Sequence, residues 1–115
     1  MAYRLALEDK VLVNIKGEFA GSSKGKKISV DFDLTMDRLG QEEINAAMAD
    51  GGSINDFLLG HTHGWDRQRL VLQDDGSPAA FCEEAFRVML QAAGLPAFIY
   101  RRYLVEVGAQ EKNSR

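Results

Sequence analysis

The stretch KVLVNIKGEFAGSSKGKKISVDFDLTM (residues 10–36) decides the fold. In each of its two halves, apolar residues alternate with mostly polar ones, which is the period of a strand with one buried face. The apolar positions are Val11, Val13, Ile15 and Phe19 in the first half, and Ile28, Val30, Phe32, Leu34 and Met36 in the second. Residues 20–27 between them are small or polar and include two glycines. The pattern predicts an antiparallel β-hairpin with strands over 10–19 and 27–36.

Two shorter segments outside the hairpin also carry a strand pattern. Tyr3, Leu5 and Leu7 alternate with polar or small residues, which allows a short third strand before the hairpin. Leu70-Val71-Leu72 allows another. The rest of residues 60–80 has no clear period and is expected to form an irregular polar loop.

The C-terminal two-thirds carry helical spacing in four places. The expected helices cover residues 40–50, 53–60, 82–93 and 96–107, each with apolar residues three or four positions apart. Ser53 is the expected N-cap of the second helix, because its hydroxyl can accept a hydrogen bond from a backbone N–H three residues later. Glycines follow three of the helices and favour their termination.

These elements predict an α+β fold in which the N-terminal antiparallel hairpin, or a small meander, packs on three to four short helices. An isolated hairpin is marginally stable in water, so its apolar face needs this cover. The length suits a single domain over residues 1–115, with the hairpin at about 10–36 and the helical part at about 40–108. Residues 109–115 are polar and are expected to be a frayed tail.

Charge and cysteine content narrow the class of protein. The net charge of −3 disfavours a nucleic-acid partner, which normally selects a basic surface. Residues 40–94 carry nine acidic and three basic side chains, which fits either a solvated acidic face or steering of a basic partner. The single Cys82 indicates a reducing compartment, and the apolar runs are too short to span a membrane. We therefore expect a protein of the bacterial or host cytoplasm with no membrane partner.

Catalytic and metal-binding patterns are weak. His61 and His63, with Asp56, Asp66 or Cys82, do not have the ligand spacing of a zinc site, and solvated histidines are the expected outcome. Cys82 lies where a helix begins and is expected to be a semi-buried helix-terminal residue rather than a nucleophile. The phosphate-binding and hydrolase motifs are missing from the sequence. We expect no enzyme activity, no metal and no cofactor.

Aromatic residues provide the remaining candidate sites. Trp65, Phe81 and Gly76 are expected to be structural anchors, with the Trp65 indole N–H bonded to a carbonyl, although a partner contact by Trp65 is the alternative. The expected partner-binding residues lie on the last two helices and are Met89, Tyr100, Arg101, Tyr103 and Leu104. The alternative is that the tyrosines of this set line the core.

Several short motifs occur in an order that resembles one protein family. Asp56-Phe57-Leu58 is followed by Gly64-Trp65, by the turn Asp75-Gly76-Ser77-Pro78-Ala79-Ala80-Phe81 and by Tyr103-Leu104. This order resembles the tail assembly chaperones of long-tailed bacteriophages and prophages, most strongly over residues 54–113. Where that family usually has Ser-Pro-Glu after the Phe, this chain has Cys82-Glu83-Glu84.

The resemblance implies a non-catalytic function. Members of that family handle the tape measure protein while the tail tube is built, so the implied partner is the tape measure protein, together with the tail tube protein. The resemblance implies holdase-like binding of apolar helical stripes without turnover. The alternative function is that of a structural tail-completion or head–tail connector protein. The open edge of the hairpin also favours a homo-oligomer.

Overall fold

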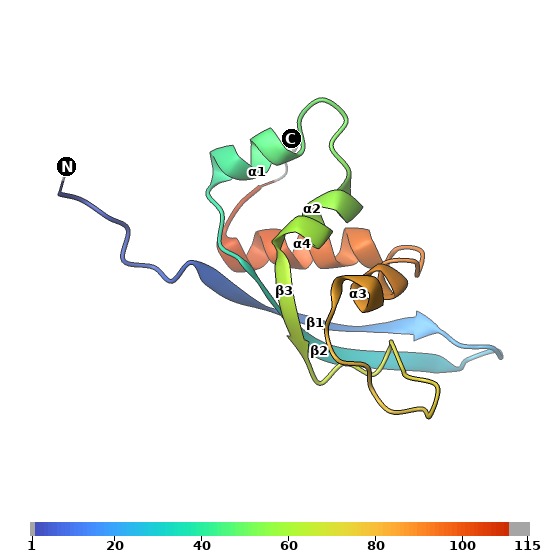
Figure 1. Cartoon of the computed structure of the whole chain (residues 1–115). Helices are drawn as coiled ribbons and strands as arrows, with labels where there is room; N and C mark the ends of the chain where they lie inside the picture. The colour runs from blue at the N-terminus through green and yellow to red at the C-terminus, as the bar shows by residue number, and fades with distance from the viewer. Residues whose placement is uncertain (1, 111–115) are drawn as a thin grey trace.

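The computed structural model describes residues 2–110 of the chain. Its seven elements, in chain order, are β1 (Lys10–Ala20), β2 (Lys27–Asp37), α1 (Gln41–Ala47), α2 (Ile54–His61), β3 (Thr62–Asp66), α3 (Glu83–Met89) and α4 (Leu95–Val107). Figure 1 shows the two long strands side by side beneath the helices, with residues 2–9 running away from the body of the molecule.

The sheet has three antiparallel strands in the order β1-β2-β3. β1 and β2 pair without interruption from Lys10 opposite Asp37 to Ala20 opposite Lys27. β3 pairs only with Asp33–Met36 of β2, with an irregularity in register between Thr35 and Met36. The predicted hairpin is confirmed within one residue at its ends, because strict alternation over a buried face fixes both strand type and register.

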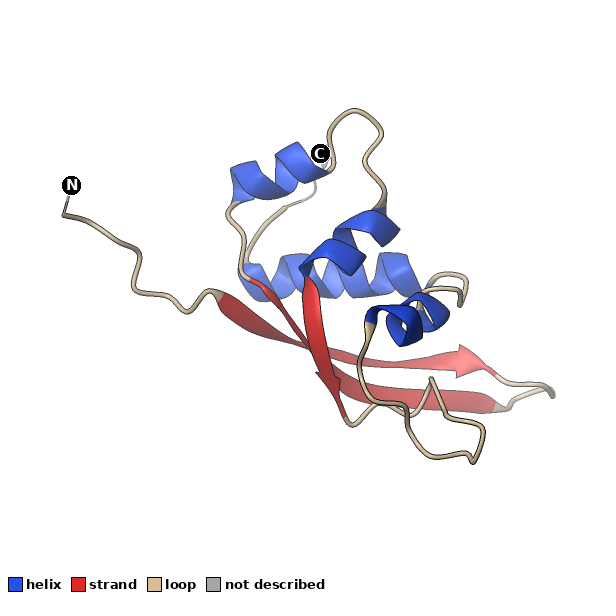
Figure 2. Cartoon of the chain, in the orientation of Figure 1, coloured by secondary structure: helices blue, strands red, loops and turns tan. Residues whose placement is uncertain are grey.

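All four helices pack on one face of the sheet, as Figure 2 shows. The buried apolar side chains form one cluster from both layers: Val11, Val13, Ile15, Val30, Phe32, Leu34, Met36, Ile44, Phe57, Leu58, Val71, Phe86, Met89, Leu90, Leu95, Ile99, Tyr100, Tyr103 and Leu104. The opposite face of the hairpin is polar apart from Leu12 and Ala20. The predicted α+β class, a hairpin packed on short helices, is confirmed.

The helix termini show how local sequence limits each helix. Ser53 Oγ accepts a hydrogen bond from Asp56 N at 3.2 Å, as its sequence position predicts. Cys82 Sγ has the same role for α3, accepting from Ala85 N at 3.4 Å. Cys82 is exposed, so the expectation of a semi-buried side chain is wrong. The first and third helices are shorter than predicted, since they end at Ala47 and Met89, with Met48 and Leu90 as their C-caps.

Two short strands that the sequence allowed do not form, and one strand was not predicted. Residues 2–9 join no sheet, and residues 70–72 contribute only an isolated bridge between Leu72 and Pro78. The third strand is instead β3, which lies within the segment expected to be an irregular loop. β3 contains a glycine and a histidine where an alternating apolar pattern would be needed to reveal it, so its sequence carries no strand signal.

The last described residues return to the first helix. Gln110 N donates to Gln41 Oε1 at 2.9 Å, and Gln41 Nε2 donates to Gln110 O at 2.8 Å. Ala109 and Gln110 are therefore held rather than frayed, while residues 111–115 of the expected tail lie outside the described part of the chain. Within residues 2–110, no helix is long and apolar enough to cross a membrane.

Candidate functional site

Four of the five predicted contact residues lie in the core. Met89, Tyr100, Tyr103 and Leu104 are buried, so the expectation that they line an exposed surface does not hold in this fold. Tyr103 is fully covered: its hydroxyl donates to Asp37 O at 2.7 Å and accepts from Leu39 N at 3.2 Å. Burial raises the pKa of Tyr103 above its usual value. Tyr103 thereby joins α4 to β2, and tyrosines that line the core were the alternative left open by the sequence.

Arg101 is the exposed member of that set, and it lies beside a groove between α4 and the hairpin. The groove has a volume of about 200 Å³. We call it the hairpin groove, and it is lined by Gly17, Glu18, Phe19, Gly94, Phe98 and Arg101. Phe19 and Phe98 are only partly buried, so aromatic surface, one cation and one anion meet at this position.

Gly17 is the reason that α4 can approach the sheet here. A Cβ atom at position 17 would lie 3.3 Å from Phe98 Cζ, which is closer than ordinary side-chain contacts. A glycine inside a strand pattern often marks such a close approach. That glycine was the available sequence signal for this groove, and Phe19 and Phe98 are the lining residues that sequence reasoning missed.

Two of the residues expected to be anchors, Trp65 and Phe81, lie together at the β3 edge of the sheet. Trp65 Nε1 donates to Ala79 O at 3.1 Å, and the indole packs edge-to-face on Phe81 with ring centres 5.3 Å apart. Phe86 extends this aromatic cluster into the core. Gly76 adopts a φ of 86° in the turn of the same loop. Trp65 thus ties β3 to the segment that follows it.

A charged cluster centred on Asp37 joins four elements. Asp37 Oδ2 is hydrogen-bonded to His61 Nδ1 at 2.9 Å, and its Oδ1 to His63 Nε2 at 2.8 Å, with Lys10 Nζ 3.3 Å from Oδ1. Burial raises the pKa of Asp37, but the hydrogen bonds from His61, His63 and Lys10 more than offset it and hold that pKa below its usual value. The two histidines are therefore bonded to one carboxylate. His63 is exposed, as expected of a solvated histidine, whereas His61 is partly buried.

The Asp37 cluster is best explained as a structural link. Both carboxylate oxygens are occupied by partners from β1, the end of α2 and β3. Among residues 2–110, no group of three or more His, Cys, Asp and Glu side chains is arranged to hold a metal ion. Asp37 was not singled out from the sequence, because an acidic residue at a strand end carries no signal of its tertiary partners.

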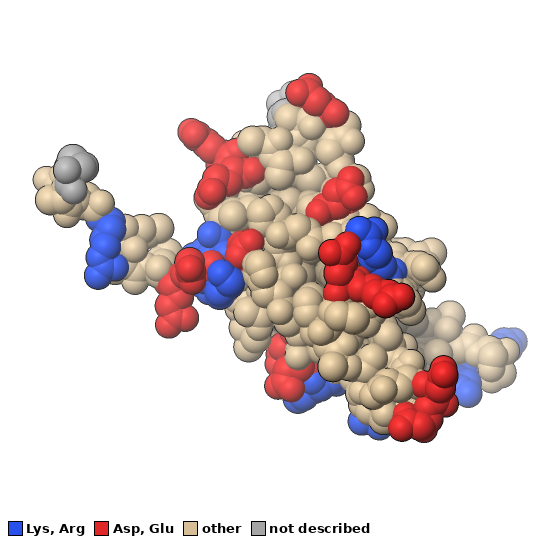
Figure 3. Space-filling model, in the orientation of Figure 1, with Lys and Arg blue, Asp and Glu red and all other residues tan. Residues whose placement is uncertain are grey.

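The outer surface is unevenly charged. Acidic side chains occupy the first turns of α1 and α3, namely Glu42, Glu43, Glu83 and Glu84. Figure 3 shows acidic groups spread over the helical part of this face, with basic groups on the segment before β1 and toward the hairpin tip. The hairpin groove therefore lies on a molecule whose helical side is acidic.

Comparisons of the chain with known protein families, with curated proteins and with solved structures found no match.

Proposed function

We propose that the protein is a non-catalytic tail assembly chaperone of a bacteriophage or prophage, and that it binds the tape measure protein and keeps it soluble in the host cytoplasm. The order of motifs from Asp56 to Leu104 supports the family. The hairpin groove is the observation that supports a binding function, because it exposes aromatic surface beside a cation.

The size of the groove indicates how a partner would be held. A volume of about 200 Å³ is below the roughly 300–1,000 Å³ of most small-molecule sites, so it suits one inserted side chain rather than a cofactor. An amphipathic helix lying across α4 and the hairpin would insert an apolar residue beside Phe98, with Arg101 at the rim. Aromatic residues and arginine are also the residue types that most often dominate binding energy.

Co-expression with the tape measure protein encoded in the same genome tests this proposal. We expect Arg101→Glu and Phe19→Gln to reduce the soluble fraction of the tape measure protein and its co-purification with this chain. Arg87→Glu is the matched control, because Arg87 is exposed on α3 and pairs only with Glu83 of its own helix. Circular dichroism establishes that each variant remains folded. If folded groove variants retain the partner as well as Arg87→Glu does, the groove is not the binding site.

A second measurement separates the chaperone from a structural phage component. A chaperone acts during assembly, so mass spectrometry of purified particles should find the chain absent or far below the level of the tail tube protein. A fixed stoichiometric amount in the particles would reject the chaperone function and favour a tail-completion or head–tail connector protein.

A further inference from the structure

The segment before β1 has the pattern of a strand but pairs with no strand within residues 2–110. We call residues 2–9 the arm. Its apolar side chains Tyr3, Leu5 and Leu7 are 88%, 76% and 59% exposed, and they alternate with polar or small residues. Figure 1 shows the start of the arm extending away from the sheet. The part of the arm nearer β1 is held by Arg38 Nε, which donates to Glu8 O at 3.0 Å, and Leu5 and Leu7 line a hollow with residues of α1 and α4. Such exposed alternation is unusual in a folded chain and suits a strand that completes another sheet.

The sheet offers an edge of matching length. β3 covers β2 only at Asp33–Met36, so residues 27–32 of β2 have a described strand on one side only. We call residues 27–32 the open edge. Asp31 O accepts a hydrogen bond from Arg67 Nη1 at 3.3 Å on the side away from β1. Because strand residues two apart point the same way, the N–H and C=O of Ser29 also face outward.

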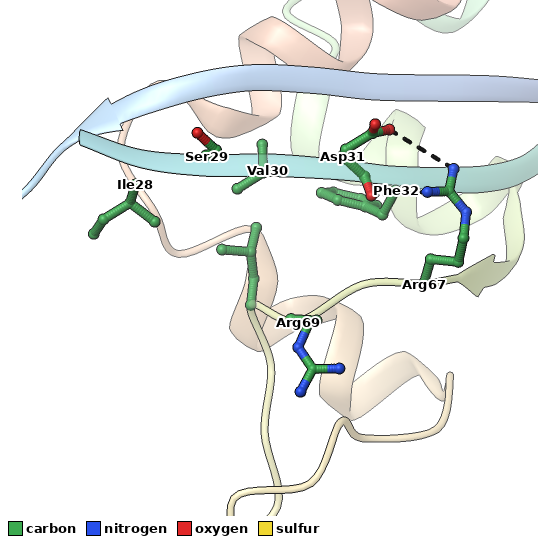
Figure 4. Close-up of a pocket in the computed structure, with 8 residues that line it drawn as sticks. Ile28, Ser29, Val30, Asp31, Phe32, Arg67 and Arg69 are labelled. Carbon is green, nitrogen blue, oxygen red and sulfur yellow. Dashed lines mark hydrogen bonds and ion pairs between the residues drawn. The ribbon is translucent and has the colours of Figure 1, made fainter.

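A hollow lies along this edge. It has a volume of about 130 Å³ between residues 28–32 and the segment of Arg67, Arg69 and Leu70. Figure 4 shows Ile28 and Val30 along the strand, with Arg67 and Arg69 across from them. Ile28 and Leu70 are exposed, so apolar surface remains uncovered where a further strand would be placed.

The arm cannot complete this edge in its own chain. The register places Lys10, where the arm joins the sheet, opposite Asp37, whereas the open edge lies at the far end of β2 near Lys27. The arm leaves from β1, on the other side of β2 from the open edge, and β3 occupies the intervening part of that side. Eight extended residues span at most about 29 Å, which is less than the roughly 33 Å from Asp37 to Lys27 along β2.

We propose that the arm of one copy pairs antiparallel with the open edge of a second copy, adding a fourth strand to its sheet. One register pairs residues of opposite charge and also places apolar residues opposite one another. It places Arg4 opposite Asp31 and Glu8 opposite Lys27, which pairs opposite charges at both ends. The same register brings Tyr3, Leu5 and Leu7 opposite Phe32, Val30 and Ile28, so that the apolar faces coincide.

The contact involves two different surfaces of the molecule. A copy that gives its arm to a neighbour still has an open edge, so the contact closes into a dimer when it is reciprocal and extends into a longer assembly when it is not. Pairing releases Arg67 from the Asp31 carbonyl, while Arg67 keeps its 2.8 Å contact with the Asp33 carboxylate.

Disulfide trapping tests the register directly. In a Cys82→Ser background, Leu7→Cys in a tagged chain is mixed with Ile28→Cys in an untagged chain under mild oxidation. Residues opposite each other in an antiparallel pair have the Cβ separation that a disulfide needs. We expect a tagged–untagged covalent dimer. The control replaces Ile28→Cys by Val105→Cys, because Val105 is exposed on α4 away from the open edge. Equal yields with the two partners overturn the proposal.

Light scattering of the unmodified chain is the second test. We expect a mass above that of a monomer at about 0.1–1 mM, and a dissociation constant raised roughly tenfold or more by Leu5→Asp, which removes one buried apolar contact. Ser29→Pro removes an outward N–H without touching the pairing with β1, and should have a similar effect. Glu8→Lys and Lys27→Glu should each weaken association, and their combination should restore it. A monomer throughout this range, with the arm folded against its own α1 and α4, overturns the proposal.

Discussion

The hairpin and the loop over residues 67–82 are built by different means. β1 and β2 hold eleven paired positions in one continuous register, and their alternate side chains form one wall of the core. The loop is held by a few individual contacts. Its main-chain bonds are those of a tight turn and one isolated bridge, and its only buried side chains are Gln68 and Val71.

Stability is distributed over many residue pairs in the hairpin and depends on a few side chains in the loop. In the hairpin each residue pair repeats the same main-chain pairing, so the loss of one buried side chain destabilises the whole sheet. In the loop the side chain of Gln68 makes hydrogen bonds that neighbouring strands would otherwise supply. Its Nε2 donates to Val71 O and Ala79 O, and its Oε1 accepts from Leu70 N and Val71 N. Removing one such residue should open the loop without unfolding the hairpin.

The largest expected effect is in the hairpin. Phe32 is only 1% exposed, so Phe32→Ala should lower the free energy of unfolding by about 3–5 kcal/mol through lost burial and the cavity that remains. Leu12→Ala is the matched control on the opposite face of the same sheet, where Leu12 is 58% exposed, and should change stability by less than about 0.5 kcal/mol. Urea denaturation measures both. Similar losses for the two variants would mean that the helical face of the sheet is not the main core.

The next effect is in the loop. Gln68→Ala removes the acceptor of two backbone N–H groups, those of Leu70 and Val71, and one of the two donors to Val71 O and to Ala79 O. The loss should cost about 2–3 kcal/mol. Hydrogen exchange should accelerate over residues 70–79 while the amides of β1 and β2 remain protected. Gln73→Ala is the control, since Gln73 is exposed in the same loop and its side chain makes one 3.3 Å hydrogen bond to Ser77 Oγ. Equal acceleration throughout β1 and β2 would contradict the separation of the two regions.

The same difference explains what the sequence could predict. The hairpin, its register and the position of the Ser53 cap follow from patterns that repeat or that act over three residues, so they were predicted. The hydrogen bond from the Trp65 indole to a carbonyl was predicted because the N–H of a Trp removed from solvent usually has an acceptor. β3 was missed because it has five residues and no apolar alternation: Thr62 and Trp65 favour a strand, but Gly64 and Asp66 do not.

The candidate sites depend on contacts between distant residues, which no local pattern encodes. Arg101 was identified, but its neighbours Phe19 and Phe98 come from elements that meet only in the folded chain. Tyr100 and Tyr103 carry the residue type of a contact surface, yet the fold uses them in its core. Periodicity gives the face of a helix that is apolar, but not whether that face meets the sheet or a partner.

Acid should lower the free energy of unfolding by protonating Asp33 and Asp37, which both lie in β2. Hydrogen bonds from Arg67 and Asn14 hold the pKa of Asp33 below its ordinary value of 3.8, and the pKa of Asp37 is also lowered. Because the folded pKa values lie below the unfolded ones, this stabilisation is complete above about pH 4 and is lost as pH falls through the folded pKa values.

Urea midpoints measured at falling pH check the acid effect. Asp37→Asn should be less stable than the natural chain at neutral pH and should lose less stability in acid. The difference should be smaller than the loss from Gln68→Ala, because solvent reaches this carboxylate and its partners. Asp75→Asn is the loop control: hydrogen bonds from Ser77 lower the pKa of Asp75, but the side chain is exposed. An unchanged acid profile in Asp37→Asn would show that Asp37 does not contribute to the acid sensitivity.

The smallest expected effect separates backbone conformation from packing. Gly76 lies in the loop turn at a φ of 86°, and its N–H donates to Gln73 O at 2.9 Å. Gly64 lies in β3, and neither glycine has an atom within 4 Å of the position that a Cβ would take. Gly76→Ala should therefore cost about 1 kcal/mol, because an L-residue is strained at positive φ, whereas Gly64→Ala should be neutral or stabilise by up to about 0.5 kcal/mol. Paired urea titrations resolve this difference, and a Gly76→Ala variant as stable as Gly64→Ala would show that the turn is not held at positive φ.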